Sequence, residues 1–294
     1  MSVFSTKLNI IANSTNSYLK SFFLKQKKNS YLLQPIKYGV FSGGKRFRSA
    51  IVVNAGKIYN IDYKKLIIVS SAIECVHSYS LMHDDLPSMD NDELRRGKPT
   101  VHKKFNEFTA ILAGNSLLTL AFQILSGKDL QLSNNYKNEL ITTLSMCAGH
   151  SGLAGGQFSD LTFENKNISK KNIINMQKKK TGELFGFCCE SIAIIGGKNF
   201  IKRKQLKAIG INIGLLFQTV DDLIDHKEDS SIVGKLTKNG KKKRKATLVN
   251  LLGYEETINL TKNLKKKINR QIKSYDKKTS DLIDSVEFIT ERKF

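Results

Sequence analysis

The sequence predicts an all-α protein, on two observations. Between Leu66 and Asp84, apolar residues recur with the period of a helix, over a stretch longer than a usual strand. Residues 209–225 follow the same pattern. No segment alternates apolar and polar residues between turn residues, as a half-buried strand would. We therefore expect a bundle of long helices in which a central layer is wrapped by others.

Short segments rich in Gly, Pro, Asn and Ser separate the expected helices. In chain order they are Ser42–Gly44, Pro87–Pro99, Asn134–Asn135, Asn165–Asn167, Gly196–Gly197 and Ser230–Lys245. None of these segments has the length or composition of a linker between domains. Because 294 residues, 40% of them hydrophobic, can form one substantial core, we expect a single domain over residues 1–294.

The chain is strongly basic, with a formal net charge of +22. Clustered Lys and Arg would indicate a nucleic-acid partner, but here Lys is scattered through every segment without interleaved aromatic residues. We therefore predict that the protein does not bind nucleic acid. No run reaches the roughly 18 apolar residues of a membrane span, and the amino-terminal segment shows no cleavage-site pattern. We expect a soluble cytoplasmic protein, and four cysteines without a CxxC pair fit reduced thiols there.

Two aspartate-rich segments end apolar stretches. In the second, Asp221 and Asp225 are four residues apart and so share one face of a helix, with Asp222 beside them. Like charges at this spacing weaken a helix unless cations bridge them. This segment therefore predicts a carboxylate surface that binds cations.

The first aspartate segment contains Asp84, Asp85 and Asp90. Pro87 disfavours helical geometry at Leu86, so the helix should end there. The chain can then turn, and Asp90 can fold back towards Asp84.

Oxygen ligands without His or Cys favour Mg²⁺, which typically bridges a few carboxylates to substrate phosphates. A single acidic helix end is more often a solvated cap, but here two such segments are accompanied by matched cations. Arg95 and Arg96 follow the first segment, and Lys45 and Arg48 lie three apart at the start of a helix. Arg side chains and helix amino termini both suit a diphosphate. The residues predict a divalent-metal site for a phosphate ester.

Residues 78–100, which run through the first aspartate segment to Arg95, Arg96 and Pro99-Thr100, closely resemble the first aspartate-rich motif of short-chain trans-polyprenyl diphosphate synthases. The resemblance continues, in the family's order, through Gly43–Arg48, Gly155–Gln157, Lys180–Gly182 and Phe217–Asp225. It covers nearly the entire chain. It implies an all-α, isoprenoid-synthase-type helical bundle around a central elongation cavity.

The resemblance also implies an activity: the Mg²⁺-dependent joining of isopentenyl diphosphate to dimethylallyl or geranyl diphosphate, by a homodimer. It assigns several metal ions to six carboxylates, those of Asp84, Asp85, Asp90, Asp221, Asp222 and Asp225. It assigns the allylic diphosphate to Arg95, Lys180 and Lys235, and isopentenyl diphosphate to Lys45, Arg48, His77 and Arg96. The Lys180 carbonyl and the side chains of Thr181 and Gln218 are its candidates for facing the allylic cation with oxygen dipoles.

Product length can be argued from Tyr79, five residues before Asp84. Its ring should project into the cavity more than one helical turn below the metals and act as a floor. With the two-residue expansion that includes Pro87, this is the pattern of bacterial-type farnesyl diphosphate synthases, which make (2E,6E)-farnesyl diphosphate. Tyr79 could instead be ordinary core filling.

Three alternatives stay open to test. A geranylgeranyl or geranyl diphosphate synthase would differ in product length, and a non-catalytic subunit of a heteromeric synthase would tend to lose an aspartate motif. A terpene cyclase is disfavoured by the second motif. The match weakens after Lys235, where Gly240 replaces a common Asp and residues 245–249 replace a Lys-x-Thr-Tyr-Pro stretch. We expect the basic run 241–245 to be a mobile lid that draws in polyanionic substrates.

Overall fold

The structure, a computed structural model, describes residues 3–26, 31–233, 246–275 and 277–292. The chain consists of two compact units. Unit 1 comprises residues 1–142 and 194–196, and unit 2 comprises residues 143–193 and 197–294. The expected single domain over residues 1–294 therefore remains a prediction.

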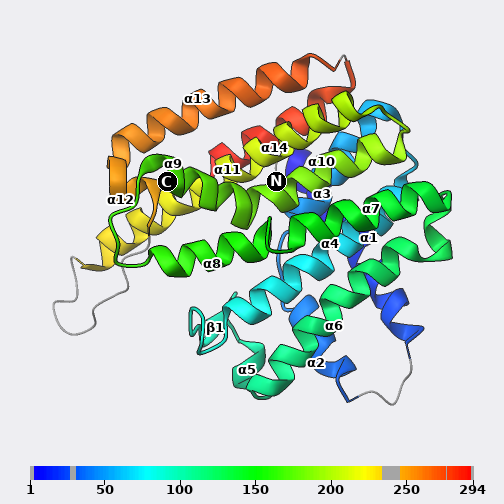
Figure 1. Cartoon of the computed structure of the whole chain (residues 1–294), viewed down its shortest axis with the longest axis horizontal. Coiled ribbons are helices and arrows are strands. Elements are labelled where there is room, and N and C mark those ends of the chain that lie inside the picture. The colour runs from blue at the N-terminus through cyan, green and yellow to red at the C-terminus, as the bar shows by residue number, and fades with distance from the viewer. Residues whose placement is uncertain (1–2, 27–30, 234–245, 276, 293–294) are drawn as a thin grey trace. The chain divides into compact units, whose positions relative to one another are not determined.

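Unit 1 is organised around one long central helix, α4 (Tyr63–Asp84), shown in cyan in Figure 1. It packs against α1, α2, α3 and α6. The other helices of this unit are α1 (Val3–Leu24), α2 (Leu33–Val40), α3 (Phe47–Gly56), η1 (Lys57–Tyr59), α5 (Val101–Lys104), α6 (Glu107–Ser126) and η2 (Lys128–Leu130). A two-stranded antiparallel sheet, β1 (Leu94–Arg95) and β2 (Lys98–Pro99), lies between α4 and α5 in the sequence.

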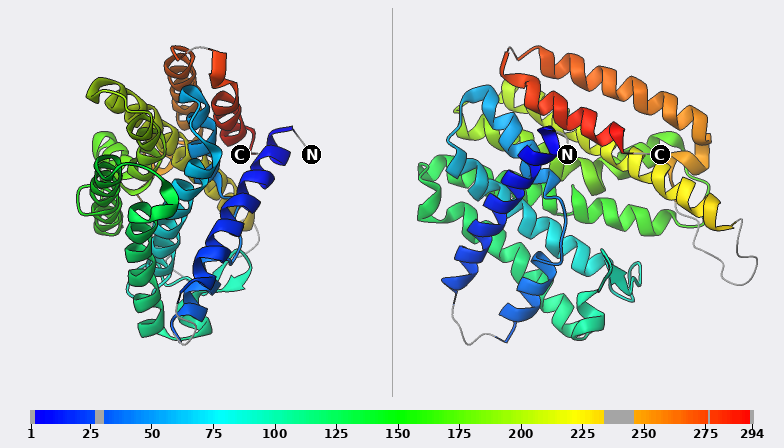
Figure 2. Two further views of the ribbon diagram at one scale, coloured as in Figure 1. Left: turned by 90° about the vertical axis from the view of Figure 1, so that its right-hand side faces the viewer. Right: turned by 180° about the vertical axis from the view of Figure 1, so that it is seen from behind.

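Unit 2 is built around α11 (Phe200–Val233), which packs against α12, α13, α14 and η3. Figure 2 shows α13 and α14, in orange and red, side by side. The unit also contains α8 (Leu153–Phe163), α9 (Lys170–Gln177), the π-helical η3 (Lys178–Gly182), α10 (Glu183–Ile195), α12 (Leu248–Leu252), α13 (Tyr254–Lys273), η4 (Lys277–Thr279) and α14 (Ser280–Glu291). The helix α7 (Asn134–Ala148) begins in unit 1 and ends in unit 2.

The sequence of α4 accounts for its central position. The Asp62 side chain accepts a hydrogen bond from the backbone N–H of Lys65 and caps the first turn. Every residue from Leu66 to Val76 is buried, so this part of the helix has no solvent face. Most of these side chains are apolar, and their burial is a large favourable term for folding.

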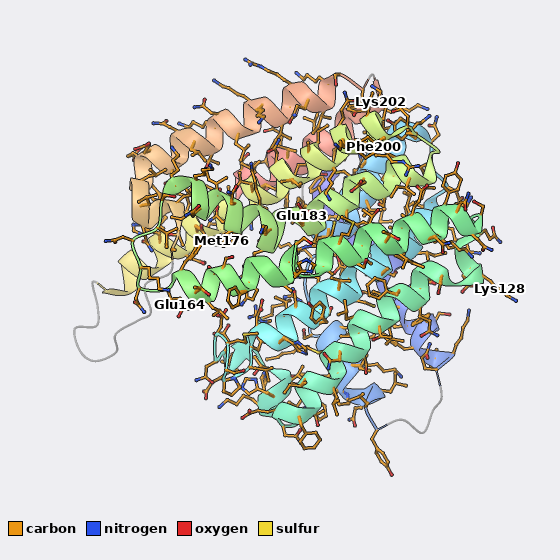
Figure 3. All side chains as sticks on the ribbon, viewed as in Figure 1. Lys128, Glu164, Met176, Glu183, Phe200 and Lys202 are labelled. Atoms are coloured by element: carbon orange, nitrogen blue, oxygen red, sulfur yellow. The ribbon has the colours of Figure 1, made fainter. Side chains whose placement is uncertain are left out.

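The predicted fold class is confirmed, and the predicted breaks at Ser42–Gly44, Pro87–Pro99, Asn165–Asn167 and Gly196–Gly197 lie between helices. The break predicted at Asn134–Asn135 is wrong, because these residues begin α7. α11 continues to Val233, beyond the break expected from Ser230. The expected break at Pro87–Pro99 contains the small sheet. Nitrogen-tipped side chains follow the outer edge of α13 in Figure 3, where Lys262, Lys266 and Lys267 are exposed.

Among the described residues, α6 alone is long and apolar enough to cross a membrane by length and composition. Its buried residues include Ala110, Ala113 and Gly114, and the helix packs closely against α4. Its exposed apolar residues include Phe108 and Leu112. Because the core helix of a soluble protein passes the same test, α6 is not a clear membrane span.

Candidate active site

The first aspartate segment forms a tight turn at the end of α4. The backbone N–H of Asp90 donates to the carbonyl of Asp84 at 2.9 Å, and that of Asn91 donates to Leu86 at 3.1 Å. Asn91 adopts a left-handed φ of 55°, which reverses the chain. The expected return of Asp90 towards Asp84 is therefore confirmed.

Asp85 is held by Arg95. The Arg95 Nε donates to Asp85 Oδ1 at 2.6 Å, and the guanidinium also bonds Asp92 Oδ2 at 3.1 Å. Burial raises the pKa of Asp85, although the bond from Arg95 opposes this shift. The pair joins β1 to the aspartate turn and fixes the position of Arg95.

The loop before α3 requires glycine at two positions. Gly43 and Gly44 have φ values of 117° and 112°, which only glycine adopts readily. A Cβ on Gly44 would lie 2.6 to 2.8 Å from the guanidinium atoms of Arg96, which also donates to the Gly43 carbonyl. Arg96, in the turn between β1 and β2, therefore packs against this loop. The contact brings Arg96 close to the loop that carries Lys45, another residue predicted to bind isopentenyl diphosphate.

His77 lies within this cation cluster. Arg48 Nη1 is 3.2 Å from His77 Nε2, and because an Arg can only donate, the imidazole nitrogen accepts. Burial holds the pKa of His77 well below its usual range, and Arg48 and Arg96 act in the same direction. His77 is therefore neutral near pH 7, with its proton on Nδ1.

A buried ion pair supports the same loop. Arg46 bonds Glu74 Oε2 through Nη1 at 3.2 Å, Asn16 Oδ1 through Nε at 3.0 Å and the Val40 carbonyl through Nη2 at 2.5 Å. Ser49 donates to the second Glu74 oxygen at 3.1 Å. Arg46 has a left-handed φ of 52°, a conformation that this network stabilises.

In unit 2, Asp222 is buried and hydrogen bonded on both oxygens. It accepts from Gln177 Nε2 at 2.6 Å and from Gln218 Nε2 at 3.0 Å. The pKa of Asp222 is raised to about 7, mainly because the carboxyl is buried. The bond from Gln218 opposes this shift, and the neighbouring Asp221 and Asp225 contribute to it. A cation bound beside these carboxylates would favour the ionised form of Asp222 and reduce the repulsion between the three side chains.

Gln218 connects this carboxylate to Thr181. The Thr181 hydroxyl donates to Gln218 Oε1 at 2.8 Å. Thr181 lies in η3, whose π-helical geometry is common at functional sites. Thr181 and Gln218, both expected to face the allylic cation, therefore contact each other. Asp222 orients the Gln218 amide by accepting a hydrogen bond from its nitrogen.

The Gly155–Gln157 segment packs against η3. A Cβ on Gly156 would lie 2.1 Å from the backbone nitrogen of Lys180, so this position leaves no room for a larger residue. The Lys180 ammonium pairs with Asp160 Oδ2 at 2.6 Å. The buried Gln157 amide has no hydrogen-bond partner among the described residues, and so it has free capacity for a ligand.

Asp221 is paired with the end of the described chain. Arg292 Nη1 lies 2.5 Å from Asp221 Oδ1, and the guanidinium carbon lies 4.4 Å from the centre of the Phe217 ring. Arg292 also donates to the Phe217 carbonyl at 3.4 Å. The second aspartate motif therefore already has a cation on one of its outer carboxylates.

The remaining residues of the site include two that the sequence predicted and five that it did not. Tyr79 is half-buried, and burial raises its pKa, with a smaller contribution from Asp84. Lys235 lies outside the described residues. The sequence did not indicate the supporting residues Arg46, Glu74, Asp160, Gln177 and Arg292. Two of them had a local signal, since Arg46 lies within the matched segment Gly43–Arg48 and Asp160 follows the matched segment Gly155–Gln157 by three residues.

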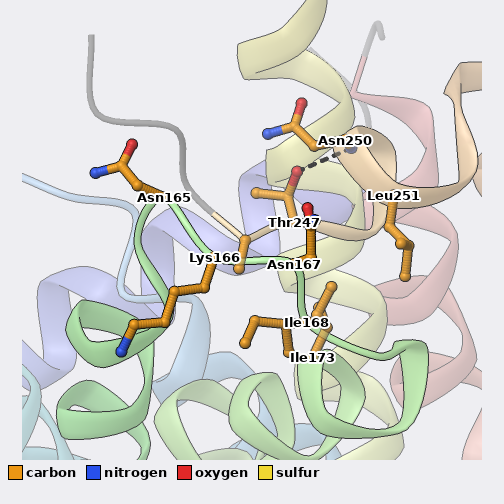
Figure 4. Close-up of a pocket in the computed structure, with 9 residues that line it drawn as sticks. Asn165, Lys166, Asn167, Ile168, Ile173, Thr247, Asn250 and Leu251 are labelled. Atoms are coloured by element: carbon orange, nitrogen blue, oxygen red, sulfur yellow. Dashed lines mark hydrogen bonds between the residues drawn. The ribbon is translucent and has the colours of Figure 1, made fainter. Parts of the chain in front are cut away.

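The donor chemistry suits magnesium. Within the described ranges, no three His, Cys, Asp or Glu side chains gather closely enough to hold a metal ion by themselves. The predicted ligands are all carboxylates, and Mg²⁺ is bound by carboxylate oxygens together with waters and substrate phosphates. The pocket of Figure 4, about 190 Å³ and lined by residues that include Asn167, Ile173 and Thr247, contains none of the predicted site residues.

Comparison with known proteins decides the family. The polyprenyl synthetase family matches residues 29–286. The chain belongs to this family. It is 40% identical over 258 residues to the farnesyl diphosphate synthase of Buchnera aphidicola subsp. Acyrthosiphon pisum, which covers 86% of this chain and 89% of that protein.

Solved structures confirm the isoprenoid-synthase fold expected for a member of this family. An FPP/GFPP synthase from Zymomonas mobilis has a TM-score of 0.85 and 35% identity, over 97% of this chain and 99% of that chain. A geranyltransferase from Helicobacter pylori, complexed with magnesium and isoprenyl diphosphate, has a TM-score of 0.81 and 31% identity, over 99% of this chain and 97% of that chain. The family resemblance inferred from the motifs is therefore confirmed.

Proposed function

We propose that the protein is a trans-prenyltransferase that condenses isopentenyl diphosphate with dimethylallyl or geranyl diphosphate to give (2E,6E)-farnesyl diphosphate. The observation that carries this proposal is the chain of contacts from Asp222 through Gln218 to Thr181. It joins a carboxylate motif to the oxygen groups that would face an allylic cation. Relatives named farnesyl diphosphate synthase, at 34 to 40% identity over most of the chain, support the product.

The chemistry needs departure of diphosphate from an allylic carbon. Bound Mg²⁺ would supply electrostatic stabilisation of the charge that develops on this leaving group. The six carboxylates of the two motifs would hold the Mg²⁺. Asp85 also fixes the position of Arg95, and Asp222 that of Gln218. Arg95, Lys180 and Lys235 would bind the same diphosphate.

The chain's own dipoles would stabilise the carbocation. The Thr181 hydroxyl, the Gln218 amide oxygen and the Lys180 carbonyl would present the negative ends of their dipoles to it, and the reaction needs no covalent bond to the enzyme. The terminal alkene carbon of isopentenyl diphosphate then forms the new carbon–carbon bond, and the proton lost afterwards goes to the released diphosphate. Exclusion of water by apolar residues protects the cation.

Isopentenyl diphosphate would bind to Lys45, Arg48, Arg96 and His77. A neutral His77 accepting from Arg48 orients that guanidinium without adding a competing charge. Three fixed cations suit a diphosphate that carries several negative charges. Tyr79 would end chain growth at fifteen carbons; geranylgeranyl or geranyl diphosphate is the alternative product.

We further propose several Mg²⁺ ions per site, a cytoplasmic enzyme and a homodimer. The exposed apolar residues Phe108, Ile111 and Leu112 on α6 offer a surface for the second copy. Size measurement of the purified protein in solution tests this assembly.

The purified protein should form farnesyl diphosphate from geranyl and isopentenyl diphosphates with Mg²⁺, and form none after EDTA. Asp84→Ala and Asp221→Ala should each remove activity. Turnover by the protein alone would exclude a non-catalytic subunit. Absence of any prenyl product at saturating Mg²⁺ would refute the proposed function.

A further inference from the structure

Tyr79 packs against one particular neighbour on its own helix. The ring of His83 lies one turn further along α4, with its centroid 5.4 Å from that of Tyr79 and the two planes at 89°. This edge-to-face geometry is the preferred one for aromatic pairs. The position of the Tyr79 ring therefore depends on where the His83 ring lies.

The His83 ring is in turn fixed by α6. His83 Nε2 lies 3.1 Å from the carbonyl oxygen of Ile111, and because a carbonyl only accepts, this nitrogen carries the proton. The ring also lies directly over Gly114. A Cβ at that position would be 2.2 Å from His83 Nε2 and 2.5 Å from Cδ2, distances that nonbonded atoms do not reach.

Gly114 is needed here for space rather than for backbone freedom. It lies inside α6, where glycine weakens a helix relative to alanine, and its φ is not in the left-handed region. Its missing side chain leaves the gap that the imidazole fills. A hydrogen bond and a steric gap, both from α6, therefore set the orientation of one ring on α4.

We propose that His83, held by Ile111 and Gly114, is a positioning residue that sets product length through Tyr79. The inference rests on the proposed function, in which Tyr79 stops the growing chain. A tyrosine ring on a half-buried helix face can rotate about its side-chain bonds, and a floor must stay in one rotamer to be selective. The His83 edge prevents that rotation on one side.

This arrangement makes α6 part of the specificity determinant. Gly114 is 30 residues after Asp84 and outside both aspartate motifs. It acts on the product only through His83. The two positions must therefore be energetically coupled, which a double-mutant cycle can detect.

The experiment compares His83→Ala, Gly114→Ala and the double variant with the parent, by the ratio of geranylgeranyl to farnesyl diphosphate. His83→Ala should raise this ratio about tenfold, the scale on which one small change in an apolar pocket discriminates between substrates. Gly114→Ala should change the ratio when His83 is present and have no further effect when residue 83 is alanine. The melting temperature of Gly114→Ala should also fall below that of the parent. It should recover in the double variant, because without the imidazole ring the new methyl group no longer overlaps residue 83.

Gly56→Ala is the matched control. A Cβ there would lie 2.5 Å from Leu66, so it also overlaps a side chain of α4, but about 20 Å of helix separates Leu66 from Tyr79. It should lower the melting temperature and leave the product ratio unchanged. This separates product selection from general loss of stability.

Tyr79→Ala separates the positioning role of His83 from the role of Tyr79 as the floor. If Tyr79→Ala lengthens the product but His83→Ala and Gly114→Ala still give the parental ratio, the positioning role is refuted and the proposed function stands. If Tyr79→Ala leaves the product at fifteen carbons, both the floor and its positioning residue are refuted. Additive effects of His83→Ala and Gly114→Ala would likewise exclude transmission through the imidazole.

Discussion

Arg46 and Glu74 form an ion pair inside unit 1, with 3.2 Å between Nη1 and Oε2 and side chains that are 4% and 2% exposed. Arg46 lies between Lys45 and Phe47 at the start of α3, and Glu74 lies on α4. The pair therefore joins the loop that carries Lys45 to the central helix. Removal of one partner leaves the other charge buried, which costs more than loss of an exposed pair.

Glu74→Ala should lower the free energy of unfolding by about 3 to 5 kcal/mol. Urea denaturation measures this change. Asp129→Ala is the control, because it breaks the largely exposed pair with Lys25, which has 3.3 Å between Nζ and Oδ2. This loss should cost no more than about 1 kcal/mol. Equal losses in the two variants would contradict a special role for the buried pair.

The free energy of unfolding should depend on pH through His77. Its pKa is lowered in the folded protein, whereas the unfolded chain takes up a proton near pH 6.5. Stability from this residue is therefore present above about pH 6.5 and is lost as the pH falls below it, by at most about 1.4 kcal/mol per pH unit.

The His77→Gln variant should show a shallower loss of stability between pH 6.5 and pH 5 than the parent. Urea denaturation at a series of pH values checks this. His150→Gln, which changes an exposed histidine, is the matched control. Parallel curves for His77→Gln and the parent would show that His77 takes up its proton equally in both states.

Arg292→Met should lower the Mg²⁺ concentration needed for half-maximal activity about two- to fivefold. The guanidinium occupies an Asp221 oxygen, so it competes with a metal ion for that ligand, and partly exposed pairs contribute up to about 1 kcal/mol. Methionine keeps apolar contact with Phe217. Mg²⁺ titration of the prenyl transfer rate measures the effect, with Arg270→Met on exposed α13 as control. A higher Mg²⁺ requirement would mean that Arg292 helps to bind the substrate instead.

Gly156→Ala should reduce kcat about 100-fold, because the added methyl group must displace the backbone at Lys180 and a misplacement of about 1 Å is enough for such a loss. Gly186→Ala is the control, since its Cβ would meet side-chain carbons of Ile211 at 2.9 Å and of Lys207 at 3.3 Å, with the Lys207 carbonyl oxygen at an ordinary contact distance of 3.5 Å. Steady-state kinetics compare the two. Similar rates would show that η3 tolerates the shift.

Much of the site could be predicted because its signals are local in the sequence. The period of apolar residues in α4 and the effect of Pro87 fix where the helix ends, and Asp90 returns towards Asp84 by a short turn. The assignment of Thr181 and Gln218 to one site joined two motifs 37 residues apart and came only through the family resemblance; their direct contact was not predicted.

The supporting residues could not be predicted, since each meets its partner over a long sequence separation. Glu74 contacts Arg46 from 28 residues away, Gln177 reaches Asp222 from 45 away, and Arg292 reaches Asp221 from 71 away. In a chain with 48 Lys and Arg residues, one arginine near the end carries no signal of its own. Only the packing of helices selects these pairs.

The sequence by itself determined the helical class, the two aspartate motifs and the chemistry of their ligands, because period, turn residues and side-chain type are local properties. Tertiary structure decided which charges are neutralised and which rings are fixed. Burial and neighbours raise the pKa of Asp222 to about 7, and α6 orients His83 against Tyr79 through a carbonyl and a missing side chain. Such effects depend on distance and solvent exclusion, which become defined only when the helices pack.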